Sequence, residues 1–159
     1  MLLYHGSNQV VRKPQLLPEQ RRLDFGPGFY LTSDLEQACH WATLKTGRLQ
    51  TGKAMVSIYV VDDTIYSGLS KLMFQKADAA WLQYVAANRS ASAKHDAYDV
   101  VIGPVANDRT MPTIARFLAG DYSVAETLRR LKSQKLKNQY AFRTEHSLEA
   151  LIYQESQEL

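Results

Sequence analysis

The sequence predicts one α+β domain that spans residues 1–159, and three observations support this prediction. The length is that of a single domain and is enough to bury about two thirds of the unfolded surface. Hydrophobic residues make up 45% of the chain and charged residues 22%, which excludes a disordered or fibrous main state. Short runs of β-branched and aromatic residues alternate with segments of helical periodicity, and there is no internal repeat.

The N-terminal third is expected to hold two strands, a long loop and a helix. The apolar run at residues 1–4 ends at a His-Gly-Ser turn, and residues 8–24 have no periodicity, which indicates a surface loop. A tight Phe-Gly-Pro-Gly segment leads into a strand at residues 29–32. Ser33, with Glu36 three positions later, has the pattern of a capping box and predicts the start of a helix.

Strands and one helix alternate in the middle of the chain. Residues 54–61 have the alternation of a buried strand, and a hairpin-like return is expected at residues 64–66. Apolar residues at helical spacing predict a helix over residues 77–88. A β-branched strand follows at residues 98–102 and is expected to stop at a Gly-Pro pair.

The C-terminal part is expected to begin with two helices, at residues 109–118 and 123–131, and Ser123 is the expected cap of the second. A strand at residues 140–142, a helical turn at 144–148 and a last strand at 150–154 bring the expected total to about six strands.

Charge and cysteine usage exclude several classes of protein. The chain has 19 Lys and Arg residues against 16 Asp and Glu, a net charge of +3 that permits a phosphate-bearing partner without requiring one. A single cysteine, Cys39, excludes a disulfide framework, and no His spacing suggests a metal, so none is expected. No stretch approaches the roughly 18 apolar residues of a membrane helix, and the first residues do not resemble a signal peptide. A soluble cytoplasmic protein is expected.

A basic stretch near the C-terminus has two interpretations. No acidic residue interrupts it, and its members are Arg129, Arg130, Lys132, Lys135, Lys137 and Arg143. It is either a solvated helix end favoured by the helix dipole or a surface for phosphate or nucleic acid.

Three segments place an unusual backbone beside a polar or aromatic side chain. Residues 5–7 are His-Gly-Ser directly after a strand, where glycine lets a ligand approach the main chain. Residues 25–32 contain Gly-Pro-Gly before Tyr30, whose ring can stack on a flat cation; this is not a dinucleotide fingerprint, which has a third glycine. Gln139 opens a strand and can bridge two hydroxyls without carrying charge. The structural alternatives are a plain turn, a core aromatic and a strand-end hydrogen bond.

Taken in order, these segments resemble the ADP-ribosyltransferase fold, in the diphtheria-toxin and poly-ADP-ribose-polymerase branch with its His, Tyr and Glu triad. His5, Tyr30 and Gln139 match the triad positions and form the expected catalytic set. The resemblance implies two small antiparallel sheets that form an NAD cleft with flanking helices. Nearly the whole chain also resembles a small bacterial family of unknown function that is often linked to toxin–antitoxin loci. The strings that recur there are residues 24–30, beginning at Asp24, and residues 98–108.

The resemblance implies a role for each motif residue in binding NAD, which is the substrate. The Gly6 main chain and Ser7 would hold the nicotinamide carboxamide, and His5 would bind a ribose hydroxyl. Tyr30 would stack on the nicotinamide ring, beside Gly28. Gln139 departs from the family because it keeps the hydrogen bond of a Glu and loses the charge. Elongation to a polymer is therefore not expected, whereas transfer of one ADP-ribose remains possible.

Polar residues flanking the strand at 98–102 have two interpretations. Asn and Asp before a helix are ordinary caps, yet the same residues can line a site. In the second interpretation Asn107 and Asp108 line the site, with Arg89 or Arg109 near the pyrophosphate, and the expected NAD-binding residues include Asn107 and Arg109. The roles of Asp24, Asn88, Arg89 and Asp108 stay open. Glu145 is a further candidate, as a substitute acid. Cys39 and His40 point about 100° apart on a helix and cannot form a dyad.

The leading hypothesis is a mono-ADP-ribosyltransferase that acts as the toxin of a toxin–antitoxin pair, with an antitoxin partner and a protein or nucleic-acid acceptor. The alternative is a non-catalytic module that binds NAD, ADP-ribose or a protein partner. A third possibility is a toxin acting on nucleic acid, which is supported by the basic stretch alone.

Overall fold

The computed structural model describes residues 1–18, 22–90, 94–107, 109–132 and 135–159. Within these ranges the fold is α+β, as predicted, with seven strands and six helices. In chain order the elements are β1 (Leu2–Ser7), β2 (Phe29–Thr32), α1 (Leu35–Leu49), β3 (Met55–Val61), α2 (Asp63–Ser67), β4 (Lys71–Met73), α3 (Ala79–Arg89), β5 (Val100–Pro104), α4 (Met111–Leu118), α5 (Val124–Leu131), β6 (Asn138–Phe142), α6 (Glu145–Leu148) and β7 (Leu151–Glu158).

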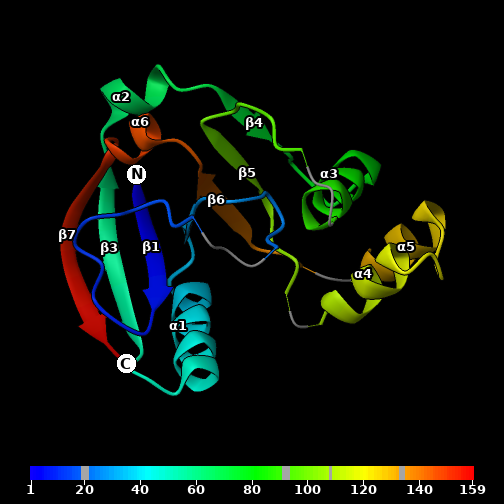
Figure 1. Ribbon diagram of the computed structural model, residues 1–159, viewed down its shortest axis with the longest axis horizontal. Coiled ribbons are helices and arrows are strands. Elements are labelled where there is room, and N and C mark those ends of the chain that lie inside the picture. Colours follow the sequence, from blue (N-terminus) through cyan, green and yellow to red (C-terminus); the bar gives the residue numbers. More distant parts are fainter. Residues whose placement is uncertain (19–21, 91–93, 108, 133–134) are drawn as a thin grey trace.

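The described strands form one mixed sheet, not the two small antiparallel sheets that were expected. Its strand order is β4-β5-β6-β2-β1-β3-β7, and the β4–β5 pair is parallel whereas the other pairs are antiparallel. The junction in the middle is narrow, because β1 and β2 are paired at one position, Tyr4 opposite Thr32. Strands β1, β3 and β7 therefore form one half of the molecule, and β6, β5 and β4 diverge from it as the other half (Figure 1).

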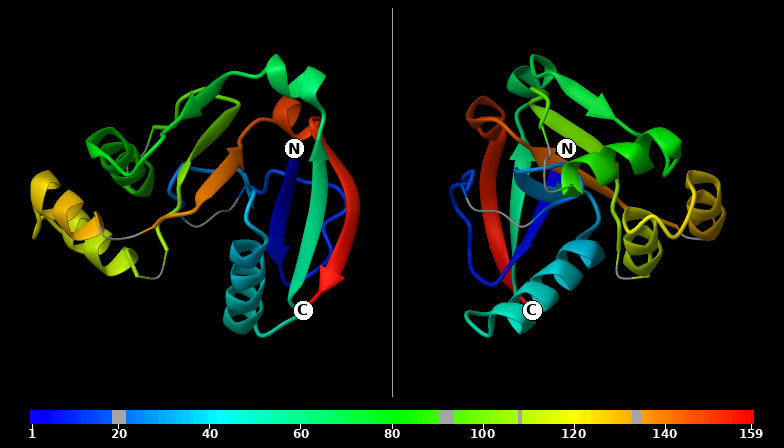
Figure 2. Two further views of the ribbon diagram at one scale, coloured as in Figure 1. Left: turned by 180° about the vertical axis from the view of Figure 1, so that it is seen from behind. Right: turned by 45° about the vertical axis from the view of Figure 1, so that its right-hand side comes forward.

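Helices cover the two halves separately. Helix α1 lies along β1 and β3, where Ala38 and Ala42 pack with Val56 and Ile58. Helix α3 lies beside β5, and α4 and α5 extend as a pair away from the β1–β3–β7 half (Figure 2). The core on that side contains the fully buried Trp81, whose Nε1 donates to the carbonyl of Pro104. None of the described helices is both long and apolar enough to cross a membrane.

The sequence-based prediction was wrong at two helix starts, where local capping is the reason, and at two strands. Asp34, not Ser33, caps α1, because its carboxylate accepts the amide hydrogen of Gln37. Asp62 accepts two amide hydrogens at the start of α2, so the expected hairpin return is a short helix. The three-residue β4 was missed, and β5 continues through the Gly-Pro pair that was expected to stop it.

The basic stretch is largely neutralised by acidic residues from outside its own sequence range or from the preceding turn. Glu126 contacts both Arg129 and Arg130, and Asp34 contacts Lys137 at 2.7 Å. Arg143 is buried, with 4% of its side chain exposed, and its Nη1 donates to Asp96 at 2.7 Å and to the Tyr84 hydroxyl at 2.9 Å. Four of the six cations therefore have carboxylate partners, which weakens the interpretation as a nucleic-acid surface.

Candidate functional site

A cavity of about 660 Å³ lies where the two halves of the sheet meet. Strands β1, β2 and β6, helix α1 and the loop after β1 all contribute to its wall. The cavity brings together six of the eight residues predicted from the sequence as site residues, namely His5, Gly6, Ser7, Gly28, Tyr30 and Gln139. These residues come from segments separated by more than a hundred positions, so their meeting is a property of the fold.

The end of β1 presents backbone to this cavity. Along β3 the strand is paired from Leu2 to Ser7, but on the β2 side its pairing is at Tyr4 alone. Alternate backbone N–H and C=O groups after Tyr4 therefore face away from β3 without a β2 partner. Gly6 is required here for packing, because a Cβ at this position would lie 2.0 Å from the carbonyl oxygen of Ala38.

His5 is held as a neutral imidazole of defined tautomer. Its Nδ1 lies 2.7 Å from the Tyr30 carbonyl oxygen, which can only accept, so Nδ1 carries the hydrogen. The ring stacks on Phe29 with centroids 4.2 Å apart. Burial lowers the pKa of His5 to about 4, outweighing the carbonyl contact that raises it, and Lys45 lowers it further. At neutral pH, Nε2 is therefore a hydrogen-bond acceptor.

The Tyr30 hydroxyl is occupied within its own loop. It donates to the Gly26 carbonyl at 2.6 Å and accepts from the Phe25 amide at 3.0 Å. Burial raises the pKa of Tyr30 well above its usual range, so the hydroxyl keeps its proton. The hydroxyl closes the 25–30 turn and is not an acid or base, which leaves the ring as the part of Tyr30 that a ligand can use.

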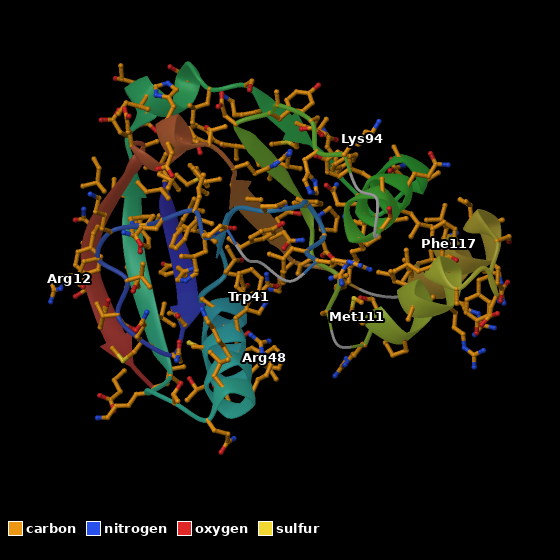
Figure 3. All side chains as sticks on the ribbon, viewed as in Figure 1. Arg12, Trp41, Arg48, Lys94, Met111 and Phe117 are labelled. Atoms are coloured by element: carbon orange, nitrogen blue, oxygen red, sulfur yellow. The ribbon has the colours of Figure 1, made fainter. Side chains whose placement is uncertain are left out.

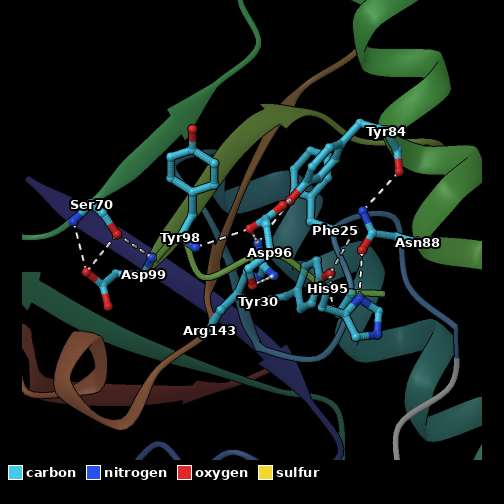
Figure 4. A network of polar contacts seen from close by, with 11 residues as sticks. Phe25, Tyr30, Ser70, Tyr84, Asn88, His95, Asp96, Tyr98, Asp99 and Arg143 are labelled. Carbon is cyan, nitrogen blue, oxygen red and sulfur yellow. Dashed lines mark hydrogen bonds and ion pairs between the residues drawn. The ribbon is translucent and has the colours of Figure 1, made fainter. Parts of the chain in front are cut away.

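The Tyr30 turn is supported from behind by a polar network (Figure 4). Gly26 has a positive φ of 78°, and a Cβ there would lie 2.9 Å from Oδ1 of Asn88. That same Asn88 oxygen lies 2.9 Å from Nδ1 of His95, and the Asn88 amide nitrogen donates to the Tyr84 carbonyl. Asn88, whose role was open, thus lies against Gly26 of the turn and is not part of the cavity wall.

Gln139 sits in the middle of the sheet, opposite Thr32 on one side and Gly103 on the other. Its side chain is buried, and Nε2 donates to Oδ2 of Asp24 at 2.9 Å. Asp24 is itself 4% exposed and forms an ion pair with Arg89, with Nη2 2.6 Å from Oδ1. Sequence reasoning left Asp24 without a role and named Arg89 only as one of two cations that could lie near the pyrophosphate; the available signal for Asp24 was its position directly before the Phe-Gly-Pro-Gly turn.

One face of α1 forms a second part of the wall that sequence reasoning missed. Trp41, Leu44, Lys45 and Arg48 line the cavity at spacings of three and four residues, which is the period of a helix face. Figure 3 shows Trp41 and Arg48 on the side of α1 turned toward α4. Lys45 donates from Nζ to the Ser7 hydroxyl at 3.2 Å, and burial together with the nearby Arg48 lowers the pKa of Lys45. This wall is cationic.

The remaining predicted residues lie elsewhere. Asn107 and Arg109 are not part of the cavity wall, and the Asn107 carboxamide oxygen accepts the amide hydrogens of Arg109 and Thr110. The capping interpretation therefore describes Asn107. Glu145 lies in the first turn of α6, outside the cavity wall. Asp108 falls outside the described residues.

No group of three or more His, Cys, Asp or Glu side chains suited to a metal ion occurs in the described ranges. A family model described as "Protein of unknown function (DUF3990)" matches residues 1–153 of the chain. No significant match was found among curated proteins or among solved structures.

Proposed function

We propose that this chain, which belongs to the DUF3990 family of proteins of unknown function, binds NAD in the cavity and transfers a single ADP-ribose from it with release of nicotinamide. One observation carries the proposal. His5, Tyr30 and Gln139, from three strands, lie around one cavity of about 660 Å³ beside the open end of β1, in the order of the ADP-ribosyltransferase triad and with Gln139 where that triad has Glu.

In the proposed complex, different residues bind the carboxamide, the pyridinium ring and the ribose of the nicotinamide riboside. The end of β1 that β2 does not pair, which includes Gly6, offers backbone donors and acceptors of the kind that a carboxamide needs. The face of Tyr30 can stack on the cationic pyridinium ring, and Nε2 of His5 can accept the hydrogen of a ribose hydroxyl.

The pyrophosphate is assigned to the cationic wall of α1. Lys45 and Arg48 line the cavity, whereas Arg109, one of the two cations expected near the pyrophosphate, does not. Two positive side chains one helical turn apart match two neighbouring phosphates in charge and spacing. Arg89 also lines the cavity, but its guanidinium is committed to Asp24.

The transfer breaks the bond between ribose C1 and the nicotinamide nitrogen. The bonding pair leaves with nicotinamide, and the ribose passes through an oxocarbenium-like state before a lone pair of the acceptor forms the new bond at C1. Gln139 accepts from the ribose 2-hydroxyl but removes no proton. Asp24 supplies the only carboxylate among the described lining residues, and it is already paired. The acceptor, a protein or a nucleic acid, must therefore bring a group that is already nucleophilic without help from a carboxylate of the site.

The paired state of that carboxylate favours a second candidate, a module that binds NAD or ADP-ribose without turning it over. The first proposal also includes a biological role. Because the chain resembles a family linked to toxin–antitoxin loci, the transferase would be a cytoplasmic toxin with a protein antitoxin.

Nicotinamide release and NAD affinity, measured side by side, test the proposal. We expect release by the purified protein and a loss of at least about a hundredfold in kcat/KM for His5→Ala and for Tyr30→Ala. Tyr30→Phe keeps the ring but loses the hydroxyl that closes the 25–30 turn, so we expect it to lose less affinity than Tyr30→Ala if stacking is the main role of Tyr30. Binding without release would support the binding module. A protein that neither binds NAD nor releases nicotinamide would contradict both.

A further inference from the structure

The buried Asp24 carboxylate plays no part in the proposed transfer, although it touches a residue that does. Its Oδ1 accepts from Nε and Nη2 of Arg89, at 2.8 and 2.6 Å. Its Oδ2 accepts from the amide of Ala106 at 3.1 Å and from Nε2 of Gln139 at 2.9 Å. Each oxygen therefore has two donors, so the carboxylate is a fixed acceptor and is not available as a base or nucleophile.

These contacts select one of the two orientations that the Gln139 amide can adopt. Nε2 lies 2.9 Å from Oδ2 of Asp24 and 3.5 Å from the carbonyl oxygen of Pro104, and both are acceptors. Turning the amide over would place Oε1 against two oxygens and leave the Asp24 contact without a hydrogen. Nε2 must therefore face Asp24, and Oε1 must point the other way.

The Oε1 atom of Gln139 is the group left for a ligand. No described residue donates a hydrogen bond to this oxygen. Among the described residues, the buried polar atoms that have neither a partner nor access to solvent do not include it, so Oε1 is accessible. Because Gln139 lines the cavity, this oxygen is reached from there.

We infer that Asp24 is the positioning residue of the site: Arg89 and the Ala106 amide hold its carboxylate, and the carboxylate turns the Gln139 amide so that Oε1 is offered to the substrate. The inference rests on the proposed function, because the hydroxyl that Oε1 would accept is that of the reacting ribose.

The position of the Asp24 carboxylate also explains why residue 139 is a glutamine and not a glutamate. A carboxylate there would lie about 3 Å from that of Asp24 in a buried site, where two like charges cannot both ionise. Gln139→Glu is therefore expected to impair the site, not to restore an acid that the chain has lost.

Four variants test the coupling: Asp24→Asn, Gln139→Glu, both together, and Asp121→Asn. The last removes the carboxylate of an exposed Asp–Arg pair, that of Asp121 with Arg116, and is the matched control. The first measurement is the side-chain amide signal of Gln139 by NMR without ligand, assigned by its loss in Gln139→Glu. We expect Asp24→Asn to shift this signal and speed its hydrogen exchange, because the substituted amide brings a donor against a donor.

The second measurement is nicotinamide release. Asp24→Asn is expected to lower kcat about tenfold or more and to change KM less than about threefold, since Oε1 acts on the reacting ribose and little on ground-state binding. The third is Tm. Gln139→Glu should lower Tm at pH 7 and recover it toward pH 5, where the new carboxyl is protonated, and the double variant should recover part of it at pH 7.

An unchanged Gln139 signal together with unchanged kcat in Asp24→Asn overturns the inference, as does a Gln139→Glu variant more active than wild type. If Asp24→Asn does not fold, Arg89→Lys replaces it: one ammonium cannot supply both donors to Oδ1, so the same NMR and kcat changes are expected. If the wild-type protein does not release nicotinamide, the proposed function fails, and the NMR and Tm measurements still decide whether Asp24 orients Gln139.

Discussion

At the scale of single residues, the protonation state of His5 is set by burial, which lowers its pKa to about 4. The unfolded chain protonates this residue near pH 6.5, so between pH 6.5 and 4 the unfolded state binds a proton that the folded state excludes. The titration of His5 therefore leaves the free energy of unfolding unchanged above pH 6.5 and lowers it as the pH falls through this window. We expect His5 alone to lower the free energy of unfolding by about 3 kcal/mol at pH 4.

Urea unfolding at pH 7 and at pH 4.5 checks this prediction. His5→Asn places an amide nitrogen near the position of Nδ1 and has no titration in the window, so its loss of stability between the two pH values should be smaller than that of the wild type. The His146→Gln variant, which replaces a histidine whose side chain is 64% exposed, is the control for the loss of a histidine outside the site. Equal pH dependence in wild type and His5→Asn would mean that His5 is not held neutral by the fold.

At the scale of elements, the contact between α1 and β1 depends on one glycine. A Cβ on Gly6 would lie 2.0 Å from the Ala38 carbonyl oxygen and 2.8 Å from the Ala42 nitrogen. Both are backbone atoms, so the helix and the strand would have to separate. We expect Gly6→Ala to lower the free energy of unfolding by about 3 kcal/mol or more. The change is measured by chemical denaturation.

Gly47, which lies in α1, is the matched control for Gly6→Ala. A Cβ there has no neighbour within 4 Å. In an exposed helix interior, replacing glycine with alanine should stabilise by about 0.5 to 1 kcal/mol. If both variants change stability in the same direction, the close approach of α1 to β1 is not the reason for Gly6.

At the scale of the whole molecule, the cavity lies at the narrow junction of the sheet and draws its wall from both halves. A ligand that fills it therefore favours the folded chain as a unit. At a hundred times its Kd, NAD should add about 2.7 kcal/mol, which corresponds to about 5 to 10 °C in Tm for a domain of this size. Differential scanning fluorimetry measures the shift.

The same measurement should show which part of the cavity binds the two phosphates of NAD. ADP-ribose carries both phosphates and is expected to raise Tm, and the double variant Lys45→Met with Arg48→Gln should lose most of that gain while keeping the fold. Arg116→Gln, which removes an exposed cation on α4, is the control. Stabilisation by ADP-ribose that survives in the double variant would exclude α1 as the pyrophosphate wall.

Local patterns were sufficient to predict most of the fold. Ser123 caps α5, as predicted, and β3 covers all but the first residue of the predicted run, because capping and β-branched alternation act over a few residues. Strand β4 was missed because its three residues carry too little pattern. The single mixed sheet replaces the two expected sheets because strand pairing joins distant segments, as Tyr4 and Thr32 do, and no local signal records it.

The sequence by itself determined the class of fold and the three segments around which the proposed site is built, since His5, Tyr30 and Gln139 were selected from their order along the chain and all three line the cavity. Only the tertiary structure decided how those residues are set. Burial made His5 neutral, and the Tyr30 hydroxyl closed its own turn. Asp24, 115 positions from Gln139, became its partner. Protonation and hydrogen-bond direction depend on neighbours in space, and the fold alone brings these neighbours together.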